Sequence, residues 1–328
     1  MRRRVILFLM KTLGKALLMI AVGVLMTAPL PAFALDPAVL QSVVRIKPDW
    51  PLAARGRDAA GAPRDPQGTG VAVLPGGYVA TNVHVLGQAE NVDVLLEDGR
   101  TLKAEIIGRD TMTDIALLKI PAEIPVLEMT VQPQLAEPVC AIGNQFGLGL
   151  SVTCGVVSAV HRSGVGFNPV EDFIQTDAAV NPGGSGGALI DAKARLVGMV
   201  SAIFTKQSDA DIGVNFATSI PLLMRVVTDL KTHGQVVRGV AGFRAGPLPQ
   251  ALAAVESGAL IESVAVGGPA FKAGLDAGDV VTHIDGKAIT TTHKLELTIF
   301  MKQPGDTLTL RVRRGSDLRE IKLTLSAP

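Results

Sequence analysis

The amino-acid sequence predicts a mostly β protein with at least two domains. The chain has 328 residues, which is long enough for two domains. It contains 35 glycines, only ten phenylalanines and one tryptophan, so we expect many turns and an aliphatic core. Short runs of valine, isoleucine and leucine alternate with glycine, aspartate and proline, as in strands separated by turns. Their dense spacing favours a β-barrel or a β-sandwich.

Residues 1–34 are typical of a secretory signal peptide. Five basic side chains and no acidic one accompany an apolar run at 16–26, and small residues lead up to Ala34. We expect cleavage after Ala34. An uncleaved membrane anchor is the alternative, because residues 16–35 are almost long enough to span a bilayer. Removal of this segment would leave a mildly acidic chain, which argues against a nucleic-acid partner.

The elements that follow are predicted mainly as strands. Residues 37–46 are expected to form the opening strand, and residues 47–67, rich in proline, glycine and charge, a long surface loop. Further strands are expected at 69–74, 78–82, 92–96, 102–108 and 115–120.

The first clear helix is predicted over 219–234. Ser219 is a suitable N-cap, apolar residues recur at helical spacing, and His233 and Gly234 end the helix. We place a domain boundary near 234–238. The remaining residues again indicate short strands, with one helix around 292–301.

The two cysteines, Cys140 and Cys154, lie on apolar runs that would face each other in an antiparallel hairpin. A disulfide is possible in an exported chain, but two cysteines in so long a chain are not a disulfide framework. We favour two small buried thiols over a bridge.

Residues 181–191, N-P-G-G-S-G-G-A-L-I-D, crowd four glycines around Ser185. Such a run is often a flexible linker. The apolar, strand-like segments on both sides, 172–180 and 188–203, argue against a linker and favour a turn that presents one hydroxyl.

A base for that hydroxyl is expected among the five histidines. His84 alone follows an apolar strand at a turn that contains threonine and asparagine. Asp114 leads directly into a strand that is expected to be buried, where an unpaired carboxylate would cost several kcal/mol. An imidazole N–H is one suitable partner, so we expect His84 and Asp114 to pair.

Four motifs, T-N-V-H-V, T-D-I-A-L-L-K-I, A-I-G-N-Q-F-G-L-G and N-P-G-G-S-G-G-A-L-I, resemble in order and spacing those of the HtrA (DegP/DegS) serine endopeptidases. The resemblance runs from about residue 38 to the C-terminus. It implies a chymotrypsin-like double β-barrel protease domain at 35–234 and a small α+β PDZ domain at 235–328. The order His84, Asp114, Ser185 is that of the chymotrypsin-like enzymes.

The resemblance also implies a role for each site residue. Ser185 would be the nucleophile, His84 the general base and Asp114 the group that orients the imidazole. The N–H groups of Gly183 and Ser185 would form the oxyanion hole. The specificity pocket would involve the apolar segment that includes Val200, Ser201 and Ala202, together with the loop 149–152; the alternative is that these residues are only barrel core.

Two positions depart from the family pattern. Gly184 stands where asparagine is usual, and Gln145 where proline is usual. Because glycine has wide conformational freedom, we expect the Gly183–Gly184 peptide to flip easily and the resting oxyanion hole to be often unformed.

Residues 239–328 resemble a single PDZ domain, in which Val240, Ala241, Gly242 and Phe243 would form the carboxylate-binding loop for peptide C-termini. Ala241 replaces a larger apolar residue, so the pocket is expected to be wider or weaker. The alternative is a domain that only packs against the protease and transmits its state.

The predicted function is that of an exported, periplasmic, ATP-independent serine endopeptidase that degrades misfolded or exposed polypeptides. A membrane-tethered protease with one client and a proteolytically idle scaffold are the alternatives. The family implies a homotrimer. No metal-ligand cluster or nucleotide loop is evident in the sequence, so we expect no metal and no cofactor.

Overall fold

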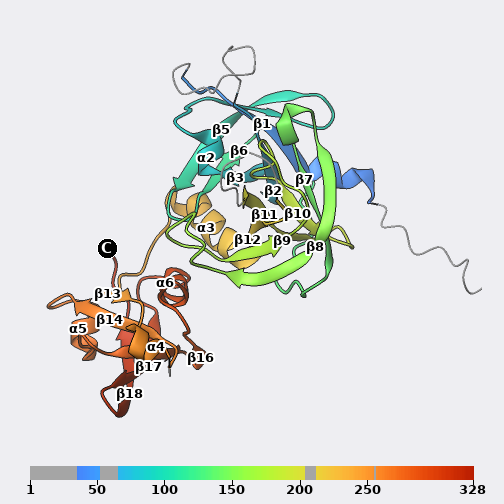
Figure 1. Ribbon diagram of the computed structural model, residues 1–328. Coiled ribbons are helices and arrows are strands. Elements are labelled where there is room, and N and C mark those ends of the chain that lie inside the picture. Colours follow the sequence, from blue (N-terminus) through green and yellow to red (C-terminus); the bar gives the residue numbers. More distant parts are fainter. Residues whose placement is uncertain (1–34, 52–65, 204–211, 255) are drawn as a thin grey trace, which may run out of the picture. The chain divides into compact units, whose positions relative to one another are not determined.

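The computed structural model describes residues 35–51, 66–203, 212–254 and 256–328. The expected signal peptide and most of the loop at 47–67 lie outside these ranges. The described residues form two closed six-stranded barrels and a separate sheet, so the expectation of a mostly β protein is confirmed (Figure 1). None of the described helices has the length and apolar character needed to span a membrane.

The first barrel has the strand order β1-β2-β3-β6-β5-β4. β2 and β6 are buried almost throughout, β4 alternates in burial, and the barrel interior is filled by aliphatic side chains such as Val44, Val79 and Leu118. The strands predicted between residues 69 and 120 are all present. The elements are β1 (Val43–Pro48), β2 (Gly68–Leu74), β3 (Tyr78–Asn82), α2 (Val83–Leu86), β4 (Val92–Leu95), β5 (Thr101–Asp110) and β6 (Ile115–Lys119).

The predicted opening strand at 37–46 is wrong in its first half. Pro37–Ser42 forms a 3₁₀ helix, η1, and the strand begins only at Val43. Proline lacks an N–H and has a fixed φ, which suits the first turn of a helix better than a strand ladder.

The second barrel has the strand order β10-β11-β12-β9-β8-β7. Its core includes Val139, Ile174 and Leu189. The elements are β7 (Pro138–Gly143), η3 (Gln145–Gly147), β8 (Ser151–Arg162), β9 (Phe173–Thr176), β10 (Ala188–Asp191), β11 (Leu196–Ile203) and β12 (Asn215–Ser219).

Cys140 and Cys154 are joined in a disulfide, so the preference for two free buried thiols is wrong. The antiparallel register of β7 and β8 places the two residues directly opposite each other, with Cα atoms 4.0 Å apart. Cys140 is buried but Cys154 is exposed. The bridge therefore closes the base of the hairpin whose tip is η3.

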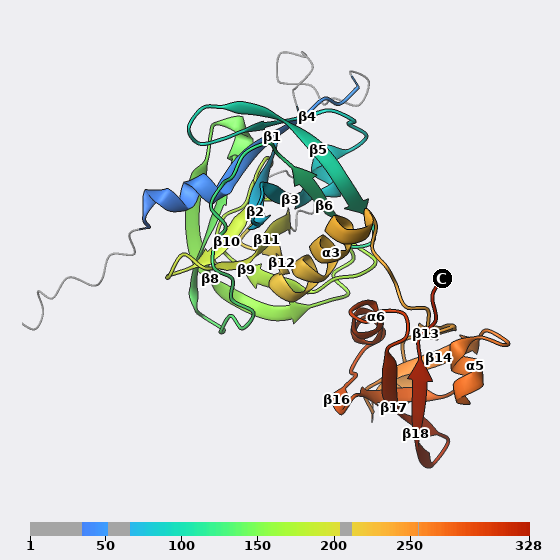
Figure 2. The same ribbon diagram turned by 180° about the vertical axis from the view of Figure 1, so that it is seen from behind.

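Helix α3 (Ile220–His233) follows the second barrel and confirms the predicted helix. The Ser219 hydroxyl accepts from the Leu222 N–H, and Gly234 adopts the left-handed conformation that ends the helix. The buried face of α3 contacts β5, β6 and β11, so the helix packs against strands of both barrels (Figure 2).

The C-terminal part is a sheet of order β13-β14-β15-β17-β18, with β16 paired to β15. Its core includes Ile261, Leu295 and Leu310. The predicted helix around 292–301 is present as α6. The elements are β13 (Phe243–Gly246), α4 (Gln250–Ala253), β14 (Ala259–Val264), α5 (Pro269–Ala273), β15 (Val280–Ile284), β16 (Lys287–Ala288), α6 (Thr292–Phe300), β17 (Thr307–Arg314) and β18 (Asp317–Thr324).

Candidate active site

His84 lies on the short helix α2, which directly follows β3. Val85 and Leu86 of this helix are buried in the first barrel, so the helix is anchored by its apolar side. The side chain of His84 points away from that core and is 51% exposed. The imidazole is therefore accessible to a ligand although its backbone is firmly held.

Asp114 fixes the imidazole through both carboxylate oxygens. Oδ1 accepts from the His84 backbone N–H at 2.9 Å, and Oδ2 lies 2.6 Å from the ring Nδ1. Asp114 adopts φ 58°, in the turn between β5 and β6, and its carbonyl accepts from the side-chain amide of Asn82. Because a carboxylate accepts at Nδ1, that nitrogen donates and Nε2 is left free to accept a proton. The expected pairing of His84 and Asp114 is present.

Ser185 lies in a tight turn between β9 and β10. The Gly184 N–H donates to the Asn181 carbonyl, and the Gly187 N–H donates to the Gly184 carbonyl. At Gly186, where φ is 84°, a Cβ atom would overlap the carbonyl of Thr69. The glycines therefore permit a left-handed backbone and close packing, and the segment is a structured turn and not a linker.

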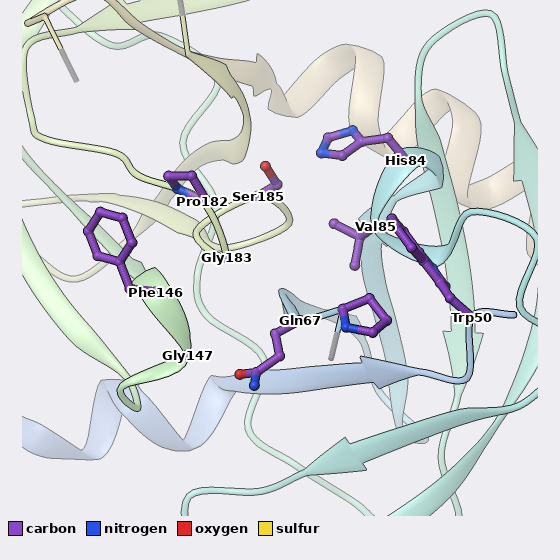
Figure 3. A pocket seen from close by; sticks show the side chains of 10 residues that line it. Trp50, Gln67, His84, Val85, Phe146, Gly147, Pro182, Gly183 and Ser185 are labelled. Carbon is purple, nitrogen blue, oxygen red and sulfur yellow. The ribbon is translucent and has the colours of Figure 1, made fainter. Parts of the chain in front are cut away.

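The structure brings Ser185 and His84 together at one cavity of about 330 Å³. The Ser185 hydroxyl and the His84 ring face each other across this cavity (Figure 3). His84 and Asp114 come from the first barrel and Ser185 from the second, so the site lies where the two barrels meet.

The backbone N–H groups of the two predicted oxyanion donors, Gly183 and Ser185, can be compared with the hydrogen bonds around them. The Pro182 carbonyl accepts from the Phe146 N–H at 2.7 Å, and the intervening peptide is trans, so the Gly183 N–H points away from Phe146. Gly183 itself has φ 94°. Among the hydrogen bonds of the described residues, neither the Gly183 N–H nor the Ser185 N–H has a partner. Both N–H groups are thus free to donate to a ligand.

The hypothesis that the Gly183–Gly184 peptide flips easily does not agree with the structure. The Gly183 carbonyl accepts from the Thr69 hydroxyl at 2.6 Å, and the Gly184 N–H donates to Asn181 at 2.9 Å, so this peptide is held at both ends. In addition, the oxyanion donor of Gly183 belongs to the preceding peptide, Pro182–Gly183. Gln145 is also engaged, since its side chain accepts from the Asn181 amide at 2.8 Å.

Thr69 was not identified from the sequence, although its N–H and its hydroxyl both bond to the turn that carries Ser185. Its N–H donates to the Ser185 carbonyl at 2.9 Å, and its hydroxyl donates to Gly183 and accepts from the Asn144 N–H at 2.9 Å. Its carbonyl accepts from the Thr81 hydroxyl at 2.7 Å. The side chain is fully buried. Thr69, on β2 of the first barrel, therefore holds in place the turn that carries Ser185 in the second barrel.

Val200 and Ser201 of the predicted specificity segment on β11 are not among the described residues that line the cavity. Val200 is buried in the core of the second barrel, in agreement with the barrel-core alternative. The Ser201 hydroxyl is buried and accepts from the Asn82 amide at 3.3 Å. Ala202 lies on the same strand, in register with Phe216. Within the loop 149–152, Val152 is 41% exposed and does not line the cavity either.

The remaining wall of the cavity is formed by residues that the sequence did not single out. They come from the segments just after β1 and just before β2, from α2 and η3, and from the turn that carries Ser185. No local sequence motif connects them. The wall consists of Trp50, Pro66, Gln67, Val85, Phe146, Gly147 and Pro182.

The predicted carboxylate-binding loop, Val240 to Phe243, precedes and enters β13. The Ala241 carbonyl accepts from the Ala270 N–H at 2.9 Å, so the N–H of Gly242 points the opposite way. Gly242 has φ 78°, and a Cβ atom there would lie 2.9 Å from Pro269. A groove runs along this loop and β13 and is lined on its other side by α6 residues Glu296, Ile299 and Phe300.

The residues of both regions match known families. The family described as "Trypsin-like peptidase domain" matches residues 68–199, and the family described as "PDZ domain" matches residues 211–325. No cluster of potential metal ligands is present in the described ranges.

Two relatives align with most of this chain. A "Probable periplasmic serine endoprotease DegP-like" from Halomonas elongata is 39% identical over 266 residues, or 79% of this chain and 56% of the relative. The "Periplasmic pH-dependent serine endoprotease DegQ" of Escherichia coli is 34% identical, covering 82% of this chain and 61% of the relative. The chain thus spans little more than half the length of these relatives.

Solved structures match over nearly their whole length. The "HtrA-type protease AlgW with tripeptide" has a TM-score of 0.75 and 32% identity, and the match covers 91% of this chain and 98% of that one. The serine endoprotease from Yersinia pestis has a TM-score of 0.62 and 30% identity, covering 89% and 97%. The double-barrel fold, the PDZ domain and these matches together place the chain in the family of HtrA-type serine endoproteases.

Proposed function

We propose that this protein is an ATP-independent serine endopeptidase in which Ser185, His84 and Asp114 form the catalytic triad. The observation that carries the proposal is the His84 ring, which is held by Asp114 at Nδ1 and faces the Ser185 hydroxyl across the cavity (Figure 3). Residues 35–234 are the protease domain under this proposal, and residues 235–328 are the PDZ domain.

The geometry supports a two-step acyl transfer. His84 Nε2 accepts the proton of Ser185 as Oγ attacks the peptide carbonyl, and Asp114 stabilises the imidazolium that forms. The N–H groups of Gly183 and Ser185 stabilise the oxyanion. Loss of one such donor typically costs about 2.7–4 kcal/mol of transition-state stabilisation. His84 then protonates the leaving amine, and water hydrolyses the acyl-enzyme by the reverse proton transfers.

A serine-directed fluorophosphonate probe tests this proposal. The wild-type protein is expected to be labelled and to cleave an unfolded protein such as casein, whereas Ser185→Ala is not labelled and is inactive. Asp114→Asn should reduce kcat by about 10⁴-fold because the wrong imidazole tautomer is favoured. An unlabelled wild-type protein, also in the presence of peptides with free C-termini, would support the idle scaffold instead.

We further propose that the groove along β13 binds the C-termini of unfolded polypeptides or activator peptides. The orientation of the Gly242 N–H and the open edge of β13 support this mode, in which a peptide adds a strand and its carboxylate meets backbone N–H groups. Solved HtrA-type relatives were crystallised with a tripeptide and a decapeptide. Gly242→Val should weaken binding of such peptides, measured by calorimetry, and leave fluorophosphonate labelling intact.

Export to the periplasm is the proposed localisation. The relatives are described as periplasmic, and the Cys140–Cys154 disulfide fits an oxidising compartment. Mass measurement of the mature N-terminus separates a free enzyme that begins after Ala34 from a membrane-tethered one. The homotrimer that the family implies is measured by light scattering of the purified protein.

A further inference from the structure

The cavity that holds His84 and Ser185 has a defined wall beyond the catalytic groups. Trp50 and Val85 lie on the His84 side, Phe146 and Pro182 on the Ser185 side, and Gln67 between them (Figure 3). The volume of about 330 Å³ is at the lower end of the range for ligand pockets, and fits a single large side chain better than an extended peptide.

The position of His84 indicates which part of a substrate enters this cavity. The acyl part of the substrate becomes bonded to Ser185, while the amine that leaves must receive its proton from His84. The cavity extends from Ser185 past His84 to Trp50 and Val85, and neither Val200 nor Ser201 of β11 is among the described residues that line it (Figure 3). The residue that follows the scissile bond is therefore the one whose side chain meets this wall.

The wall is apolar and offers little to a charged group. The Trp50 indole N–H already donates to the Leu86 carbonyl at 2.9 Å, so the ring presents carbon to the cavity. The Gln67 Oε1 accepts from the Asn144 amide at 3.0 Å. Among the described residues that line the cavity there is no lysine, arginine, aspartate or glutamate. A charged substrate side chain would lose water there without gaining a partner.

The two sides of the wall differ in how firmly they are held. The indole of Trp50 lies against Gly87, where a Cβ atom would be 2.9 Å from Cε2, so there is no room behind the ring. Phe146 adopts φ 57° at the tip of the β7–β8 hairpin and is 49% exposed. Trp50 is thus a fixed surface, and Phe146 is a side chain whose removal should not disturb the fold.

We propose that this cavity binds the side chain of the residue immediately after the scissile bond, and that it selects a large apolar side chain of the size of leucine or phenylalanine. The inference rests on the proposed function. Trp50 and Phe146 are then specificity-determining residues on the leaving-group side of the site.

Peptide substrates that differ only in the residue after the cut test the proposal. With the wild-type protein, kcat/KM for leucine or phenylalanine is expected to exceed that for alanine by about tenfold or more, since a single methylene in an apolar pocket is worth about 10–200-fold. Aspartate and lysine should be the poorest. Equal rates for all five residues, or a preference for a charged one, would overturn the proposal.

Phe146→Ala should lower several-fold the ratio of kcat/KM for the leucine substrate to kcat/KM for the alanine substrate. Phe271→Ala is the matched control, because Phe271 is also an exposed phenylalanine, at 52%, but lies on α5 and does not line the cavity. The same fall in both variants, or no fall in Phe146→Ala, would contradict the assignment.

The single tryptophan provides a second measurement that does not depend on turnover. In Ser185→Ala, a product-like peptide with leucine at its free N-terminus should shift the fluorescence of Trp50, whereas the aspartate analogue should not. A leucine peptide that inhibits the wild-type enzyme competitively but leaves the fluorescence of Trp50 unchanged would refute the placement. Failure of fluorophosphonate labelling, in contrast, would refute the proposed function itself.

Discussion

The hydroxyl of Thr69 is predicted to hold the oxyanion hole in its working geometry. The hydroxyl donates to the Gly183 carbonyl at 2.6 Å and accepts from the Asn144 N–H at 2.9 Å. It therefore connects the turn that carries Ser185 to the segment that follows β7. Thr69→Val keeps the branched shape of the side chain but removes the hydroxyl. The buried Asn144 N–H and the half-buried Gly183 carbonyl then both lose their partner.

The magnitude follows from these two contacts. An unsatisfied buried polar group costs about 1–3 kcal/mol, and the half-buried Gly183 carbonyl costs less than the buried Asn144 N–H, so the variant should lose about 2–4 kcal/mol of unfolding free energy. If the Gly183 segment relaxes by turning its carbonyl elsewhere, one oxyanion donor is misplaced, and kcat should fall by about 10²-fold or more. KM should change little, because the donor acts mainly in the transition state.

The assay is steady-state hydrolysis of a peptide, with the concentration of folded active sites determined by burst titration and the stability by urea unfolding. Thr69→Ser is the control, since serine retains the hydroxyl, and its kcat should stay within a few-fold of the wild-type value. A Thr69→Val protein that is destabilised but keeps its kcat per folded site within about twofold would refute the positioning role and leave Thr69 a purely structural residue.

Three other predictions concern stability and the departures from the family pattern. Gly184→Asn should leave turnover within about twofold of wild type, because the Gly183–Gly184 peptide is already held at both ends; a clear rise in kcat would restore the flipping hypothesis. Reduction of the Cys140–Cys154 disulfide, which closes a loop with a separation of 14 residues, should lower the unfolding free energy by about 3 kcal/mol, measured in urea with and without reductant. Burial raises the pKa of Asp279, but the Arg314 guanidinium, 2.7 Å away, and the Asp276 N–H, which donates to the carboxylate, together outweigh burial, and the pKa is lower than usual. The stabilisation by Asp279 should thus be complete above about pH 5 and decline as the pH falls through the ordinary value near 3.9; Asp279→Asn should be less stable at pH 7, by about 3 kcal/mol, and less acid-sensitive, as unfolding curves from pH 3 to 7 will reveal.

The sequence predicted best the candidate site residues whose types and order along the chain match one class of protease. His84, Asp114 and Ser185 stand in motifs whose chain order is typical of one protease class, and the structure brings them to one site. The strands of the first barrel were also predictable, because alternating burial and turn residues are local signals. Helix α3 carried a cap at each end in the sequence itself.

Features that depend on distant contacts were not predictable. Whether Cys140 and Cys154 meet depends on the register of β7 and β8, which neither run encodes alone. The cavity wall is assembled from segments far apart in the chain, so Trp50 and Phe146 carry no shared motif. Thr69 is likewise an ordinary strand residue until the second barrel docks against it.

Because the site is divided between two barrels, it is assembled only late in the synthesis and folding of the chain. Residues 84 and 114 exist in a nascent polypeptide before residue 185 has been added, and each barrel closes its own hydrogen-bonding ladder separately. Under the proposed mechanism, a molecule whose second barrel is incomplete has no nucleophile and cannot cleave its neighbours. Activity would then begin only after the second barrel has folded and docked against the first.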